Sequence, residues 1–275
     1  MIKQCAFGPR MPGSAAHKKC RDYIYGEMQK SCTNARLQEF SHVWSQNQKS
    51  ITMWNIIGDQ NWKDATVRVV LFAHWDSRAE ADQDRDVENR KLPIPGANDG
   101  ASGVAVLLEL ARVLKDHLPP SVGVEYVMTD GEDLGPGEDE MYLGADLYAN
   151  GIASMPKANY GILLDMIGQK DLVVPKEVNS IRYVNRLMSA FYDHAASVGL
   201  SSTFPSTVGE EIDDDHLPMI KAGLPTIDLI EFSGYAPYWH TLQDTPDKCS
   251  ADSLGKVGKL LQTWLQKTPT FKLTD

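Results

Sequence analysis

Short apolar runs recur along this chain, and each has an acid or an imidazole at or near its end. The runs cover residues 65–73, 123–128, 160–168 and 226–232. Apolar and β-branched side chains that can cover both faces are typical of inner strands in a parallel sheet. The pattern therefore predicts four buried strands, with their polar, chemically active side chains gathered at the carboxyl edge of the sheet, where ligand crevices form.

Segments with helical spacing alternate with these strands. Ser14 can cap a helix that runs to about Lys30, and Ser250 can cap the closing helix. Other predicted elements are helices at 101–116, 141–148, 178–198 and 216–220, strands at 40–48 and 51–57, and loops at 80–95 and 135–140. The alternation predicts a single α/β domain over residues 1–275, in which helices flank both faces of a mixed, mostly parallel, twisted sheet.

Charge and hydropathy exclude several classes of protein. The formal net charge is -10 and Lys and Arg form no run, which argues against a nucleic-acid partner. No stretch approaches the roughly 20 apolar residues of a membrane helix, and the first thirty residues lack the apolar core of a signal peptide. These features leave two alternatives, a cytosolic protein or an exported one whose leader is absent from this sequence.

The four cysteines do not indicate a metal knuckle or a redox motif. They lack C-x-x-C spacing, and their even number permits one or two disulfides without requiring any. They are Cys5, Cys20, Cys32 and Cys249.

The side chains at the strand ends form a set of carboxylates and imidazoles without a thiolate. The set is His74, Asp99, Glu132, Asp133, Asp165 and His240. Nitrogen and oxygen ligands suit a catalytic zinc ion that keeps an open position, whereas structural zinc sites are richer in thiolates. The alternatives are structural, because Asp99 could simply cap the helix that follows it and the acids at 130–133 could form a solvated loop. We favour the metal site because the pattern recurs at several strand ends.

Six motifs in this order resemble the M28 zinc aminopeptidases and their relatives, the glutaminyl cyclases. They are His74-x-Asp76, Gly96-Ala97-Asn98-Asp99-Gly100, Asp130-Gly131-Glu132-Asp133, Leu163-Leu164-Asp165-Met166, Asp214-Asp215-His216 and Trp239-His240-Thr241. Aminopeptidases more often have Ser-Asp-His at the fifth motif. The Asp-Asp-His-Leu-Pro sequence at 214–218 therefore favours a cyclase of bacterial type.

The resemblance implies roles for the strand-end residues. Asp99, Asp133 and His240 would bind one zinc ion, although the family more often has Glu at the position of Asp133. Glu132 would move protons, and Asp165 and Asp214 would form a hydrogen-bonded acid network. A protein of the aminopeptidase kind would use a second ion, held by His74, Asp99 and Asp165.

The resemblance also implies a substrate, a compartment and an oligomeric state. The substrates would be peptides or proteins with a free amino terminus, and Trp239 and Trp75 are candidates for the wall of the substrate pocket. Relatives of this kind are commonly exported, so we expect a secreted or periplasmic monomer. A catalytically silent scaffold with the same fold is less favoured, because it has no reason to keep a costly cluster of like charges.

Overall fold

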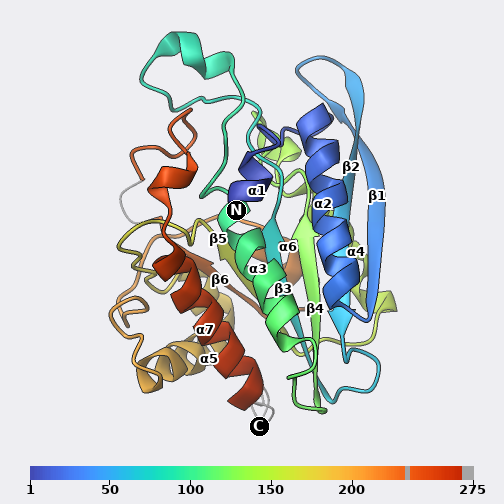
Figure 1. The fold of residues 1–275 in the computed structure, drawn as a ribbon, viewed down its shortest axis with the longest axis vertical. Coiled ribbons are helices and arrows are strands. Elements are labelled where there is room, and N and C mark those ends of the chain that lie inside the picture. Colours follow the sequence, from blue (N-terminus) through green and yellow to red (C-terminus); the bar gives the residue numbers. More distant parts are fainter. Residues whose placement is uncertain (233–235, 268–275) are drawn as a thin grey trace.

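The computed structural model describes residues 1–232 and 236–267 and contains one six-stranded sheet (Figure 1). The strand order is β1-β2-β4-β3-β5-β6. The last four strands in this order, β4, β3, β5 and β6, run parallel to one another, whereas β2 is antiparallel to both β1 and β4. The strands are β1 (Asn34–Trp44), β2 (Lys49–Gln60), β3 (Val67–His74), β4 (Val122–Thr129), β5 (Tyr160–Asp165) and β6 (Thr226–Ile230).

The four runs of apolar residues form the parallel part of the sheet, as predicted. Side chains alternate between two cores along each strand: Val69 and Leu71 of β3 belong to the larger core, and Val70 and Phe72 to the smaller one. Burial on both faces is the reason that these strands are apolar throughout.

Helices cover both faces of the sheet, which confirms the predicted α/β architecture. In Figure 1, α2, α3 and α7 lie in front of the sheet, and α4 and α6 lie behind it. The larger core packs α2, α3, α5 and α7 on one face, whereas α4 and α6 pack on the other. The helices are α1 (Ile2–Cys5), α2 (Ala15–Ser31), α3 (Ala101–Leu114), α4 (Leu143–Gly151), α5 (Val178–Ser197), α6 (His216–Lys221) and α7 (Ala251–Lys267).

The prediction for the first strand was wrong in its position. We expected a strand at 40–48, but β1 starts at Asn34, and residues 45–48 form the turn to β2. Its amino-terminal half is partly exposed at the edge of the sheet and is polar, so it lacks the apolar pattern that identifies inner strands. Its pairing with β2, from Asn34 opposite Asp59, holds it in the sheet.

The structure bears on the state of the cysteines and on membrane-spanning helices. All four cysteines lie within the described residues, and each is a free thiol. In the same part of the chain, no helix combines the length and the apolar character that crossing a bilayer requires.

Candidate active site

The carboxyl ends of the parallel strands bring the predicted site residues together. His74 ends β3 and Asp165 ends β5, whereas Glu132 and Asp133 follow β4 in a tight turn at Gly131, whose φ is 70°. His240 belongs to the segment after β6 and has a positive φ of 51°, which is uncommon for a residue other than glycine. Neighbouring contacts must therefore hold the His240 turn in place.

Asp99, Asp133 and His240 converge as the resemblance implies. His240 Nε2 lies 3.5 Å from Asp99 Oδ2 and 3.4 Å from Asp133 Oδ2. These atoms fall within 4.8 Å of one another, and all three residues are buried. One nitrogen and two carboxylate oxygens could thus share a single ion.

Asp99 also belongs to a second group of possible ligands. Its other oxygen, Oδ1, lies 3.1 Å from His74 Nε2, and Asp165 Oδ1 lies 3.2 Å from the same nitrogen. His74, Asp99 and Asp165 could hold an ion of their own. Asp99 therefore faces both positions, one with each oxygen, and would be a bridging ligand if both positions were filled.

The donor atoms of the first group, Asp99, Asp133 and His240, suit a zinc ion. Asp133 Oδ2 is buried and accepts no hydrogen bond from the described residues, a costly arrangement for a carboxylate unless a cation is bound. On the far side of the imidazole, His240 Nδ1 faces Asp82 Oδ1 at 3.3 Å. An outer carboxylate on the second ring nitrogen is the usual companion of a metal-binding histidine.

Glu132 stands beside the ligands and belongs to neither group. Its Oε2 lies 3.6 Å from His74 Nδ1. Burial, together with the charges of Asp133, Asp214 and Asp215, raises the pKa of Glu132 well above its usual value, although His74 opposes the shift. Glu132 is thus a carboxyl group that can carry a proton near neutral pH, as a general acid and base must.

Asp165 and Asp214 are coupled by charge rather than by a hydrogen bond. Burial raises the pKa of Asp214 well above its usual value, and the charges of Asp165 and Asp215 add to the effect. Within the described residues the two carboxylates share no hydrogen bond: Asp165 Oδ1 accepts one from the backbone N–H of Met166, and Asp214 Oδ1 from that of Asp215, at 2.8 and 2.6 Å. The expected hydrogen-bonded network is therefore corrected: within the described residues, Asp165 and Asp214 form a cluster of acids whose charges interact, without a hydrogen bond between them.

A small cavity of about 110 Å³ opens between these groups. Trp239 and Phe232 line it and meet edge to face, with ring centroids 5.1 Å apart. Trp239 also stacks on His240 at 3.7 Å. The other lining residues are Asp99, Glu132, Asp133, Met141, Tyr142, Asp165, Met166, Ile212, Asp213, Asp214, Ile230 and His240.

Trp75 is not part of the cavity wall, so that prediction was wrong. Its side chain is fully buried in the larger core, where it stacks on His17 at 4.3 Å and donates a hydrogen bond from Nε1 to the carbonyl of Trp54. Successive residues of an extended segment point to opposite sides, so the residue after His74 points away from the site.

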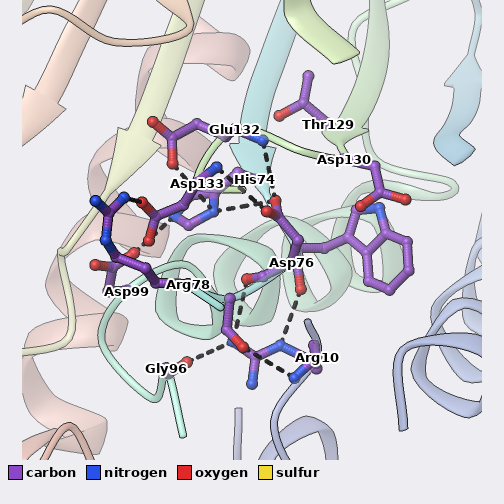
Figure 2. A network of polar contacts seen from close by, with 12 residues as sticks. Arg10, His74, Asp76, Arg78, Gly96, Asp99, Thr129, Asp130, Glu132 and Asp133 are labelled. Atoms are coloured by element: carbon purple, nitrogen blue, oxygen red, sulfur yellow. Dashed lines mark hydrogen bonds and ion pairs between the residues drawn. The ribbon is translucent and has the colours of Figure 1, made fainter. Parts of the chain in front are cut away.

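Two aspartates that the sequence reasoning did not assign hold the ligand-bearing turns, and Figure 2 shows one of them, Asp76. The carboxylate of Asp76 accepts hydrogen bonds from the backbone N–H groups of Glu132 and Asp133 at 3.3 and 3.2 Å. Asp244 does the same for Asn98 and Asp99 at 2.8 and 3.1 Å. Asp76 was visible in the His-x-Asp motif, but the sequence does not reveal that a side chain binds a distant backbone.

Arg10 ties the Asp99 loop to the end of β3. Its guanidinium is fully buried and donates to the carbonyls of Trp75, Pro95 and Gly96 at 2.9, 2.8 and 2.6 Å. Figure 2 shows Arg10 below the strand ends, opposite Glu132 and Asp133. The guanidinium of Arg10 donates its hydrogen bonds to backbone carbonyls. Arg10 therefore supports the site without forming ion pairs with the acids that could bind an ion.

The chain is similar to a known protein family and to several solved structures. The sequence model of peptidase family M28 matches residues 55–265. The chain is 35% identical to the crystal structure of Tannerella forsythia glutaminyl cyclase, with a TM-score of 0.91 over 96% of this chain and 95% of that one. A Zn-dependent exopeptidase from Parabacteroides distasonis is 34% identical, with a TM-score of 0.91 over 96% and 94%. Glutaminyl-peptide cyclotransferase of Bos taurus is 26% identical over 93% of this chain and 77% of its own length.

Proposed function

The chain belongs to peptidase family M28, and on that premise we propose that it is a zinc-dependent glutaminyl-peptide cyclotransferase. It converts the amino-terminal glutamine of a peptide to pyroglutamate and releases ammonia. The observation that carries this proposal is the likeness to solved glutaminyl cyclases, at 35% and 34% identity over 96% of the chain. The substrates are peptides or proteins with a free amino terminus. Export and a monomeric state stay predictions.

One zinc ion is held by Asp99, Asp133 and His240. The support for this assignment is the convergence of their donor atoms and the buried, unpaired Oδ2 of Asp133. When bound, the ion supplies a Lewis acid that polarises the side-chain amide carbonyl of the substrate. The acids of the cavity carry out the remaining proton transfers.

Glu132 moves the proton that the reaction must relocate. The substrate's α-amine forms a bond to the amide carbon, the carbon–nitrogen bond to the amide nitrogen breaks, and ammonia leaves. Glu132 takes one proton from the attacking nitrogen and delivers it to the departing one, so no net proton is consumed. An α-amine has a pKa near 8, and the upward shift of the Glu132 pKa narrows the difference between the two groups, which favours proton transfer.

Asp165 and Asp214 orient the attacking amine. Both line the same cavity as Trp239 and Phe232. A carboxylate accepts hydrogen bonds from the amine, and a protonated partner reduces the repulsion within the cluster. The indole of Trp239 excludes water from the glutamine side chain, which favours attack by the tethered amine over hydrolysis.

The geometry of Asp99 favours one other candidate, a two-metal aminopeptidase. Because Asp99 faces both groups of ligands, His74 and Asp165 could complete a second metal position. Such an enzyme would activate water and cleave the first peptide bond.

A single assay with two readouts separates the candidates. The purified protein is loaded with zinc, its metal content is measured, and it is incubated with a glutamine-initiated and a leucine-initiated peptide. The cyclase releases ammonia from the first peptide, leaves the second intact and needs one ion per chain. Free leucine and two ions per chain would establish the aminopeptidase instead.

A further inference from the structure

Arg78 lies behind the candidate zinc position and contacts two different carboxylates. Its Nη1 donates to Asp133 Oδ1 at 2.5 Å, and its Nε and Nη2 donate to Asp82 Oδ2 at 2.9 and 2.7 Å. The side chain is only 11% exposed. It follows β3 by four residues, at the start of the long surface loop, and Figure 2 shows its guanidinium directed at Asp133.

We propose that Arg78 is a positioning residue that orients two of the three zinc ligands, Asp133 directly and His240 through Asp82, and thereby sets the affinity of the site for its ion. The inference rests on the zinc site of the proposed function. It extends that function, because it concerns how one side chain coordinates ligands from two separate segments of the chain.

The hydrogen bond from Arg78 to Asp133 restricts the orientation of the Asp133 carboxylate. Arg78 occupies Oδ1, so only Oδ2 remains for an ion, and Oδ2 is the atom that lies 3.4 Å from His240 Nε2. An aspartate has a short side chain, and a hydrogen bond to one of its oxygens leaves little rotational freedom for the other. Asp133 is thus presented as a ligand through one oxygen.

The contact between Arg78 and Asp82 restricts the orientation of the His240 imidazole. Arg78 binds Oδ2 of Asp82, and the other oxygen, Oδ1, faces His240 Nδ1 at 3.3 Å. A carboxylate that faces Nδ1 at this distance favours the imidazole tautomer with its proton on Nδ1, which leaves Nε2 free to bind an ion.

The backbone of the same loop supports the His240 turn. The N–H of Gln83 donates to the carbonyl of His240 at 3.2 Å, and Asp84 accepts from the N–H of Leu242 at 3.1 Å. Both contacts lie on the carboxyl side of His240 and help to hold its turn, in which φ is positive. Arg78 connects this anchored turn to the Asp133 turn.

Charge and geometry make different predictions for Arg78. A positive charge near the ion should by itself weaken zinc binding, whereas ordered ligands should strengthen it. Lysine keeps the charge but lacks the planar guanidinium that reaches two carboxylates at once. If orientation is the role of Arg78, Arg78→Lys must weaken zinc binding, although it leaves the charge unchanged.

The test measures zinc affinity by competition with a chromogenic chelator, and ligand geometry by the visible spectrum of the Co²⁺-substituted protein. We expect Arg78→Lys and Arg78→Met each to raise the zinc Kd by about 10- to 100-fold and to alter the Co²⁺ spectrum. Arg85→Lys is the matched control, because Arg85 is exposed in the same loop. It should leave both readouts unchanged.

A second variant covers the case in which Arg78 variants do not fold. Asp82→Asn keeps the shape of the side chain but weakens the link between Arg78 and His240, so it should raise the Kd in the same direction. The effects of Asp82→Asn and Arg78→Met should be non-additive if the two residues act in one chain of contacts.

The outcomes distinguish this inference from the proposed function. Wild-type zinc affinity in Arg78→Lys and Asp82→Asn overturns the inference, even if the protein releases ammonia normally. A wild-type protein that binds zinc but forms no pyroglutamate overturns the function, whereas a raised Kd in the variants still supports the inference. A wild-type protein without measurable zinc affinity overturns both.

Discussion

At the scale of single residues, the environment separates the roles of two adjacent acids. Asp133 pairs with Arg78 and keeps one oxygen directed at His240, as a ligand must. Burial, together with the charges of neighbouring acids, raises the pKa of Glu132, as the role of a proton carrier requires. The same type of functional group thus serves two purposes one residue apart.

Glu132→Gln should abolish proton transfer without disturbing the zinc ligands. We expect kcat for ammonia release to fall by about 10²- to 10⁴-fold, the range that general acid–base catalysis contributes. Zinc content and thermal stability should stay near those of the wild type. Glu88→Gln, at an exposed acid of the surface loop, is the control. Normal turnover by Glu132→Gln would remove this residue from the mechanism.

The two tryptophans first assigned to the substrate pocket should respond differently to substitution. Trp239→Ala removes the aromatic wall, so KM for a glutamine peptide should rise while the free energy of unfolding changes little. Trp75→Phe removes a buried hydrogen bond and core volume, so it should lower the free energy of unfolding by about 1–3 kcal/mol and leave KM unchanged. Steady-state kinetics and denaturant titration measure both effects. A changed KM in Trp75→Phe would contradict its placement in the core.

At the scale of elements, the start of α3 depends on close approach to the sheet. A Cβ atom on Gly103 would lie 2.3 Å from the carbonyl oxygen of Leu164 in β5. Only glycine permits this packing, which holds the amino end of α3, and with it Asp99, beside the strand ends. Helical spacing alone did not reveal the requirement.

Gly103→Ala should therefore be destabilising although alanine favours helices. We expect the free energy of unfolding to fall by about 1–3 kcal/mol, because the helix must move away from β5. Gly255→Ala in α7 is a matched control, since its Cβ would meet no atom within 4 Å, and it should gain up to about 1 kcal/mol from helix propensity. Urea titration of both variants measures the difference. Equal effects of the two substitutions would refute the packing argument.

At the scale of the whole molecule, the fold concentrates acids at one edge of the sheet, and their ionisation lowers the free energy of unfolding. Burial and the charge of Asp99 raise the pKa of Asp244 to about 7, and burial raises that of Asp215 to about 7. The unfolded chain has carboxyl pKa values near 3.9, so the folded, zinc-free protein binds more protons between about pH 4 and pH 7. Its free energy of unfolding should fall as the pH rises through that window.

Zinc should reverse this trend, because its ligands bind it when deprotonated. The difference in Tm between the zinc-loaded and the zinc-free protein should widen from about pH 5 to about pH 8. Thermal unfolding at a series of pH values, with and without chelator, measures it. A difference that stays constant or narrows would contradict a zinc site made of these carboxylates.

The sequence alone determined the strands, the fold class and the candidate ligands. Inner strands are apolar on both faces and end in functional side chains, so their positions can be predicted from the sequence alone. The partly exposed β1 carries no such pattern, and its start was missed. That residues 1–275 form a single domain stays a prediction.

Only the tertiary structure decided which side chains support the ligands. Arg10, Arg78, Asp76, Asp82 and Asp244 act on groups that are distant in sequence, and their contacts depend on how the loops meet at the sheet edge. Trp75 is buried in the larger core because its side chain points away from the site. Local sequence patterns record the period and burial of an element, whereas the partners of a loop side chain depend on the packing of the whole chain.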